Sequence, residues 1–81
     1  MKVTVIGGGS TYTPELAEGL IQGATALGLK TVTLYDVDEK RLLIVGNFVK
    51  RMAKAKGNPF QVFLTMDRAE AISGASFVIT Q

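Results

Sequence analysis

Three consecutive glycines, Gly7 to Gly9, directly follow a short run of β-branched and apolar residues, Lys2 to Ile6 (KVTVI). Such a run is typical of a strand buried on both faces, as in a parallel sheet covered by helices. Glycine permits a sharp turn and a close approach of the backbone to a ligand, because it has no Cβ. Helix-starting residues come next, so this stretch predicts a strand, a glycine turn and a helix.

The first helix has recognisable start and stop residues. Thr13 is expected to cap it, Pro14 to take the first helical position, and Glu15 to lie in the positively polarised first turn. Apolar residues recur at helical spacing up to about Leu27, and Gly28 follows as a stop. The helix is therefore predicted to run from the Thr13–Pro14 pair to Leu27.

The same alternation continues to the last residue. A strand is expected over Thr31–Tyr35, followed by a helix from Glu39 to about Lys56 that is capped by Asp38 and stopped by Gly57. Another strand is expected over Phe60–Thr65. A short helix follows, capped by Asp67 with Glu70 three residues on and ending at Gly74, and the last expected strand is Ser76–Thr80. The second helix has an apolar face of Leu42, Val45, Phe48, Val49 and Met52, and Phe60, Phe63 and Phe77 are assigned to the core or to strand faces.

The order βαβαβαβ with short connections predicts an α/β, Rossmann-like parallel sheet with right-handed crossovers. A doubly wound domain continues with further strands after the fourth, whereas here the sequence ends directly after the fourth strand. Residues 1–81 are therefore expected to be the N-terminal part of a truncated dinucleotide-binding domain, with the rest of that domain and a catalytic domain absent.

The glycine turn is the first candidate binding element. Gly7 and Gly9 can bring backbone N–H groups close to a pyrophosphate at the positive end of the first helix, and Ser10 and Thr11 add hydroxyl donors. Tyr12 stands where the pattern G-x-G-x-x-G/A has a small residue, so the loop is expected to be longer than usual, with Tyr12 on its rim. The competing interpretation is a tight turn that binds nothing.

Asp36, at the carboxyl end of the second strand, is the second candidate. In a dinucleotide fold this carboxylate accepts hydrogen bonds from the adenosine ribose and repels a 2′-phosphate, which favours NAD over NADP. Lys40 and Arg41 are nearby cations that could instead accept that phosphate, so Arg41 is included among the cofactor-binding candidates. The alternative role of Asp36 is a turn or cap residue.

The third candidate is Thr80–Gln81, at the end of the fourth strand, where the sheet edge faces the nicotinamide side of such a crevice. Ordinary strand-end polarity explains it equally well. Thr65 and Asp67 lie on the same rim, where Asp67 is expected to act as a cap. The cations near the end of the second helix, Lys50, Arg51, Lys54 and Lys56, are expected to form a solvated face at the negative end of the helix dipole.

Composition narrows the class of protein. The 81 residues carry a formal charge of +2 without a basic stripe interleaved with aromatics, so nucleic acid is not an expected partner. There is no Cys and no His, so no metal site of those ligands can form from this chain. Neither a signal-peptide apolar region nor a run of ~18 apolar residues is present, and a cytoplasmic protein without membrane contact is expected.

Three stretches, VTVIGGGSTYTPELAEGLI, LYDVDEKRLLIVGNFVKRM and LTMDRAEAISGASFVITQ, together resemble glycoside hydrolase family 4, most closely its 6-phospho-β-glucosidases. The likeness covers Lys2 to Gln81, which is only the beginning of such an enzyme. GGGSTYTPEL is a fairly specific string, and Glu15 after the proline is more like the β-glucosidase branch than the α-glucosidase one.

This resemblance implies an NAD-dependent hydrolase of 6-phospho-sugars, an exception to the usual two-carboxylate glycosidases. In the family, NAD⁺ takes hydride from C3 of the sugar, a divalent metal, usually manganese, stabilises the charge formed when the C2 proton is removed, and the glycoside leaves by elimination. Gly7, Gly9, Ser10 and Thr11 match the phosphate loop, and Asp36 matches the ribose-contacting acid. The metal ligands and catalytic tyrosine fall outside this chain, so no catalytic or metal residue is assigned here. A homo-oligomeric parent enzyme is expected.

Two other interpretations remain open from the residues themselves. The start of a lactate/malate-type NAD dehydrogenase has the same strand order, glycine loop and acidic residue. A non-catalytic nucleotide-sensing Rossmann module would bind nucleotide without dependence on a metal or a sugar.

Overall fold

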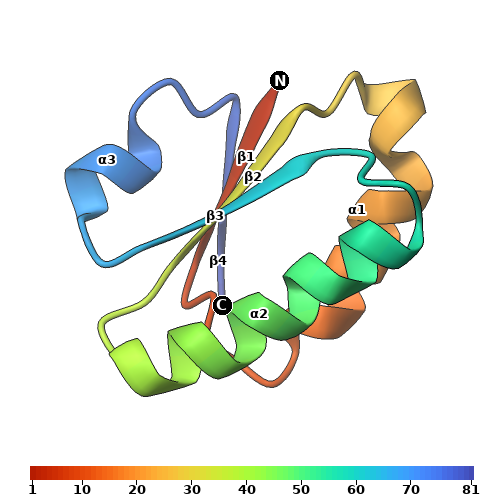
Figure 1. Ribbon diagram of the computed structural model, residues 1–81. Helices are drawn as coiled ribbons and strands as arrows, with labels where there is room; N and C mark the ends of the chain where they lie inside the picture. Colours follow the sequence, from red (N-terminus) through yellow and green to blue (C-terminus); the bar gives the residue numbers. More distant parts are fainter.

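The computed structural model describes all residues, 1–81, as one parallel sheet with three helices (Figure 1). In chain order the elements are β1 (Lys2–Ile6), α1 (Thr13–Leu27), β2 (Thr31–Tyr35), α2 (Glu39–Ala55), β3 (Gln61–Thr65), α3 (Arg68–Ile72) and β4 (Phe77–Thr80). The predicted order βαβαβαβ is confirmed, and most boundaries lie within one residue of those expected. No helix is both long and apolar enough to cross a bilayer.

The strands lie in the order β3-β2-β1-β4, all parallel. The chain moves outward from β1 through β2 to β3 and then returns to the other side of β1 with β4. Strand order therefore reverses between β1 and β4, and in open α/β sheets the crevice at such a switch point, beyond the carboxyl ends of the strands, binds the ligand. The register aligns Ile6 with both Tyr35 and Thr80, so these three strand ends form one edge.

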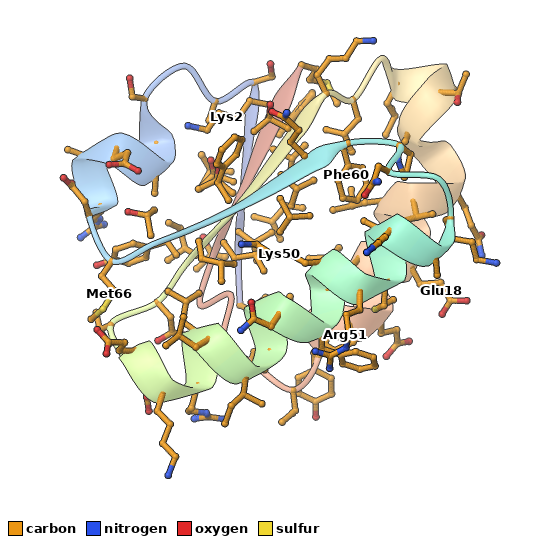
Figure 2. All side chains as sticks on the ribbon, viewed as in Figure 1. Lys2, Glu18, Lys50, Arg51, Phe60 and Met66 are labelled. Carbon is orange, nitrogen blue, oxygen red and sulfur yellow. The ribbon has the colours of Figure 1, made fainter.

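Helices α1 and α2 lie side by side on one face of the sheet, and α3 lies on the other (Figure 1). Val5, Leu34 and Val49 are almost completely buried between the sheet and the helix pair. On the α3 side, the Thr4 hydroxyl donates to the Ala71 carbonyl oxygen. The ammonium group of Lys2 points toward α3 (Figure 2) and donates to the carbonyl oxygen of Ser73 at 2.8 Å. Hydrogen bonds from polar side chains thus connect α3 to the sheet, whereas apolar packing holds α1 and α2 against the other face.

The start of α1 differs from the prediction. Thr13 is the first residue of the helix and not its cap; the cap position belongs to Tyr12, whose side chain makes no capping hydrogen bond. Thr13 is instead buried, and its hydroxyl oxygen accepts a hydrogen bond from the Gln81 side chain at 2.9 Å. Tertiary contact with the end of β4 therefore overrides the capping preference of threonine at this position.

The other two helix starts are confirmed. The carboxylate of Asp38 accepts from the Arg41 N–H at 3.1 Å, and that of Asp67 accepts from the Glu70 N–H at 3.2 Å. Helix α2 ends at Ala55, one residue before the expected Lys56, and Gly57 follows with a left-handed φ of +81°.

The predicted apolar face of α2 was partly wrong. Leu42 and Val49 are buried, but Phe48 is 46% exposed, and Gly46 is buried against Leu64 of β3, where a Cβ would lie 2.4 Å from the Leu64 side chain. A glycine there lets α2 approach β3, which turns the buried face of the helix toward Gly46 and leaves Phe48 on the outer side. Phe60 is buried just before β3, whereas Phe63 and Phe77 lie on exposed parts of the outer strands.

Candidate nucleotide-binding site

The glycine turn is attached to the end of β2. Gly7 takes a left-handed φ of +82°, which reverses the chain directly after β1. The N–H groups of Gly7 and Gly8 both donate to the carbonyl oxygen of Tyr35, at 2.9 and 2.8 Å. The turn therefore lies against the carboxyl edge of the sheet, at the switch point between β1 and β4.

Close packing restricts the second and third positions of this turn to glycine. A Cβ on Gly8 would lie 2.7 Å from the Leu34 Cβ and 3.0 Å from the Leu34 Cα. A Cβ on Gly9 would lie 2.8 Å from an Asp36 carboxylate oxygen and 3.1 Å from the backbone nitrogen of Leu42. Gly8, the unassigned middle position of the predicted Gly7-x-Gly9 motif, is thus a residue that sequence reasoning missed.

Asp36 connects the glycine turn to the start of α2. One carboxylate oxygen accepts from the Gly9 N–H at 2.9 Å, and the other accepts from the Asp38 N–H at 3.0 Å. Burial alone would raise the pKa of Asp36. The backbone N–H groups of Asp38, Gly9 and Val37 and the charge of Arg41 outweigh that effect and hold the pKa below its ordinary value. The group is a carboxylate at neutral pH, and each oxygen keeps a lone pair for a ribose hydroxyl.

The lowered pKa of Asp36 predicts how stability depends on pH. Because the folded pKa lies below the unfolded value of about 3.9, the ionised carboxylate stabilises the fold above that pH, and this contribution is lost as the pH falls through the folded pKa. We expect the difference in urea midpoint between the wild type and Asp36→Asn to be constant from pH 7 to 5 and to shrink below about pH 4. A difference that grows on acidification would contradict this assignment.

The free donors of the site lie one step beyond the glycines. The N–H groups of Gly7, Gly8 and Gly9 are all bonded within the chain, whereas those of Thr11 and Glu15 have no partner. The Ser10 side-chain oxygen accepts from the Tyr12 N–H at 3.2 Å, so its own O–H can still donate outward. In this structure the N–H groups of Gly7, Gly8 and Gly9 hold the turn against Tyr35 and Asp36. The free donors at the positive end of α1, where an anion would be stabilised, belong to the Ser10–Thr11 segment and Glu15.

The other predicted site residues occupy different places on the same edge. The exposed Arg41 lies in the first turn of α2. It is close to the glycine turn, because a Cβ added to Gly9 would lie 3.1 Å from the Arg41 Cβ. Thr80 is exposed at the end of β4, aligned with Ile6. Thr65 accepts from the Asp67 N–H with its hydroxyl oxygen at 3.0 Å, and Asp67 caps α3, so this pair serves local structure.

Gln81, which the sequence pairs with Thr80 at the end of the fourth strand, lies on the same edge. Its backbone N–H donates to the Ile6 carbonyl oxygen at 3.0 Å, while its side-chain amide donates to Thr13. Gln81 also lines a hollow of about 350 Å³ together with Tyr12 and Ile79. Tyr12, 71% exposed, stands on the rim of this hollow, in agreement with the expected longer loop. A larger hollow, of about 570 Å³, lies by the amino end of β3 and is away from the switch point.

Comparison with known proteins decides the family. The model of the family 4 glycosyl hydrolases matches residues 2–81, which is the entire chain except the first methionine. The chain belongs to glycosyl hydrolase family 4. Of the three interpretations that the residues left open, this match supports the glycosidase over the lactate/malate-type dehydrogenase and the nucleotide sensor.

Relatives within family 4 are 6-phospho-glucosidases. The chain is 45% identical to a probable 6-phospho-β-glucosidase of Bacillus subtilis and 42% identical to a 6-phospho-β-glucosidase of Escherichia coli. All of this chain is covered in both alignments, but only 19% and 18% of the respective relatives. Identity to the 6-phospho-α-glucosidase 1 of Lacticaseibacillus paracasei is lower, at 30%. The chain thus spans about a fifth of the length of these relatives.

Solved structures of the family have the same fold over this region. A 6-phospho-β-glucosidase from Thermotoga maritima, solved with manganese, NAD⁺ and glucose-6-phosphate, superposes with a TM-score of 0.93 at 41% identity. This match covers 100% of the chain and 19% of the Thermotoga protein. A 6-phospho-α-glucosidase from gut microorganisms, solved with NAD and glucose-6-phosphate, gives a TM-score of 0.94 at 32% identity, with 100% and 18% coverage.

The residues of this chain fit a family 4 nucleotide site and do not fit its metal site. Asp36 and the Ser10–Thr11 segment are acceptors and donors suited to a ribose and a diphosphate. By contrast, the chain has neither Cys nor His, and no three acidic side chains come together to hold an ion. No ligand for the manganese present in the Thermotoga structure is therefore assigned to residues 1–81.

Proposed function

We propose that this chain forms the adenosine-diphosphate side of the NAD site of a 6-phospho-β-glucosidase. In this proposal Asp36 binds the ribose hydroxyls, and the Thr11 N–H and the hydroxyls of Ser10 and Thr11 bind the diphosphate at the positive end of α1. Gly7 and Gly9 shape the turn. Arg41 lies beside the ribose, and Thr80 faces the nicotinamide side. The substrate of the whole enzyme is a 6-phospho-β-glucoside, and a divalent metal is held by residues other than those of this chain.

One observation carries the proposal: the 2.9 Å hydrogen bond from the Gly9 N–H to the Asp36 carboxylate. Asp36 and the glycine turn are therefore neighbours at the switch-point edge, and this supports the proposal because a dinucleotide fold binds the ribose with the acid and the diphosphate with the glycine-rich turn. The higher identity to β-glucosidases than to α-glucosidases supports the β-specificity. Bound NAD would supply the hydride acceptor for C3 of the sugar, and this chain would position it.

A cytoplasmic enzyme that acts as a homo-oligomer is part of the same proposal. NAD and phosphorylated sugars are charged molecules that do not cross a bilayer unaided, which places an enzyme that uses both inside the cell. Nucleic acid has no role in it.

The test is calorimetric titration of the 81-residue chain with NAD⁺, ADP and NADP⁺. We expect NAD⁺ and ADP to bind with similar affinity, because all the proposed contacts of this chain except that of Thr80 are to the adenosine and the diphosphate. NADP⁺ should bind about tenfold more weakly or worse, because its 2′-phosphate meets the Asp36 carboxylate. Binding of NADP⁺ as tightly as NAD⁺ would show that Arg41 accepts the phosphate, and an absence of heat with all three nucleotides would reject the site.

A further inference from the structure

Helix α1 begins without a local cap. The Tyr12 side chain, at the cap position, makes no capping hydrogen bond, whereas Asp38 and Asp67 cap α2 and α3. A capping side chain accepts from the N–H of the second or third helical residue. The second residue of α1 is Pro14, which has no N–H, so a cap would occupy the N–H of Glu15. Without a cap that donor stays free for a ligand, and the start of the helix has to be fixed by some other contact.

Gln81 supplies a contact of this kind from the end of the chain. Its side-chain amide donates to the hydroxyl oxygen of Thr13, the first residue of α1, at 2.9 Å. Thr13 is only 1% exposed, so the amide is the partner of a buried hydroxyl group. The two residues are 68 positions apart in the sequence, and Figure 1 shows the C-terminus next to the end of β1. The hydrogen bond therefore connects the residue after β4 to the start of α1.

The backbone of Gln81 is itself held at the sheet edge. Its N–H donates to the Ile6 carbonyl oxygen at 3.0 Å, which continues the pairing of β4 with β1 by one residue. A Cβ on Gly7 would lie 3.0 Å from the Gln81 carbonyl oxygen, so the backbone of Gln81 also packs against the glycine turn. A side chain that extends from a fixed backbone can hold its partner in a defined position.

The donors proposed for the diphosphate lie between two anchored points. Before the Ser10–Thr11 segment, the N–H of Gly9 is bonded to the Asp36 carboxylate. After the segment, the side chain of Thr13 is bonded to Gln81. Binding groups that are fixed before the ligand arrives lose less conformational entropy when they bind it. The hydrogen bond to Gln81 therefore affects how well this segment binds, although it lies outside the segment.

We propose that Gln81 is a positioning residue for the diphosphate of the nucleotide and that it acts through Thr13. Its side chain fixes the start of α1 without occupying the free N–H groups of Thr11 and Glu15, one of which a cap would use. This inference rests on the proposed function, because it concerns the same diphosphate. In this proposal Gln81 does not contact the ligand, and binding of the adenosine ribose by Asp36 is independent of it.

The test is an NMR titration of the 81-residue chain with ADP and with adenosine, which lacks the diphosphate. We expect ADP, but not adenosine, to shift the backbone amide signals of Thr11 and Glu15. Gln81→Met and Thr13→Val each remove one partner of the hydrogen bond, and each should bind ADP about threefold to tenfold more weakly than the wild type. Adenosine should bind both variants as it binds the wild type, because its contacts do not involve the start of α1.

Three further variants distinguish positioning from general stability. Thr13→Ser keeps the hydroxyl group and should bind ADP as the wild type does. The double variant Gln81→Met with Thr13→Val should bind ADP no more weakly than the weaker of the two single variants, because both act through one hydrogen bond. Gln61→Met is the matched control: it makes the same change at an exposed residue of the opposite, amino-terminal edge of the sheet and should leave ADP binding unchanged.

The proposal is wrong if ADP shifts Thr11 in the wild type but binds the single variants equally tightly, or if the losses of the two single variants multiply in the double variant. It is also wrong if Thr13→Ser loses as much affinity as Thr13→Val, or if adenosine loses as much affinity as ADP. If ADP shifts neither Thr11 nor Glu15 in the wild type, the proposed diphosphate site is rejected together with this inference. Because Gln81 is exposed, Gln81→Met is expected to keep the fold and decides the question even if Thr13→Val unfolds.

Discussion

Substitution of Gly8 by valine is expected to destabilise the chain by at least about 3 kcal/mol, because the new side chain has no space. Its Cβ would lie 2.7 Å from the Leu34 Cβ, 3.0 Å from the Leu34 Cα and 3.2 Å from the Tyr35 nitrogen. Two of these atoms belong to the backbone of β2, a central strand that cannot shift without breaking its pairing with β1 and β3. For a domain of this size, that loss lowers the melting temperature by roughly 12 °C or more.

Thermal unfolding followed by circular dichroism measures this effect, and Gly19 provides the matched control. A Cβ on Gly19 would meet nothing within 4 Å, and the residue lies inside α1. Gly19→Ala should therefore stabilise the chain by about 0.5–1 kcal/mol, because alanine loses less backbone entropy than glycine in a helix. An unchanged melting temperature for Gly8→Val would mean that the glycine turn does not pack on β2 as described.

Asp36→Asn is expected to reduce NAD⁺ affinity by about tenfold to a hundredfold, which corresponds to one charged hydrogen bond of about 1.5–3 kcal/mol. Both carboxylate oxygens accept backbone N–H groups, from Gly9 and Asp38. Asparagine has only one acceptor oxygen, so its NH₂ group must face one of these N–H donors. The substitution therefore loosens the turn and removes an acceptor for the ribose, although the asparagine side chain has the same shape as the aspartate.

The control for Asp36→Asn is Asp38→Asn, which removes the same charge two residues away. Asparagine caps a helix about as well as aspartate does, so the bond from the Arg41 N–H is retained and α2 stays intact. In calorimetric titrations NAD⁺ should bind Asp38→Asn within about twofold of the wild type. Equal losses in both variants would show that only general negative charge matters here, and equal heats for Asp36→Asn and wild type would remove Asp36 from the site.

Local interactions explain why so much of the fold could be predicted. The runs KVTVI and TVTLY form strands with the expected boundaries, since β-branched residues favour extended backbone wherever both faces are covered. Asp38 and Asp67 cap α2 and α3 because a cap bonds an N–H only three residues on. Interactions of this range are fully contained in a short stretch of sequence.

Residues whose role depends on distant contacts were not predictable in the same way. Thr13 has the capping preference of any threonine before Pro14, but Gln81, 68 residues away, draws its side chain into the interior. The sequence assigns no role to Gly8, whereas in the structure Gly8 packs against Leu34 and Tyr35 at the end of β2. The sequence places Phe48 on the apolar face of α2, but Gly46 is the residue that packs against Leu64 of β3, and Phe48 is 46% exposed.

The sequence by itself determined the order of strands and helices, the position of the glycine turn and the acid that follows the second strand. Each of these features depends only on residues that are adjacent in the chain. Only the tertiary structure decided which contacts these parts make. It bonded the glycine amides to Tyr35 and Asp36, left the Thr11 N–H free, and joined the Gln81 side chain to Thr13. Those contacts join segments that are far apart in the chain, and no pattern of neighbouring residues indicates which distant segments will meet.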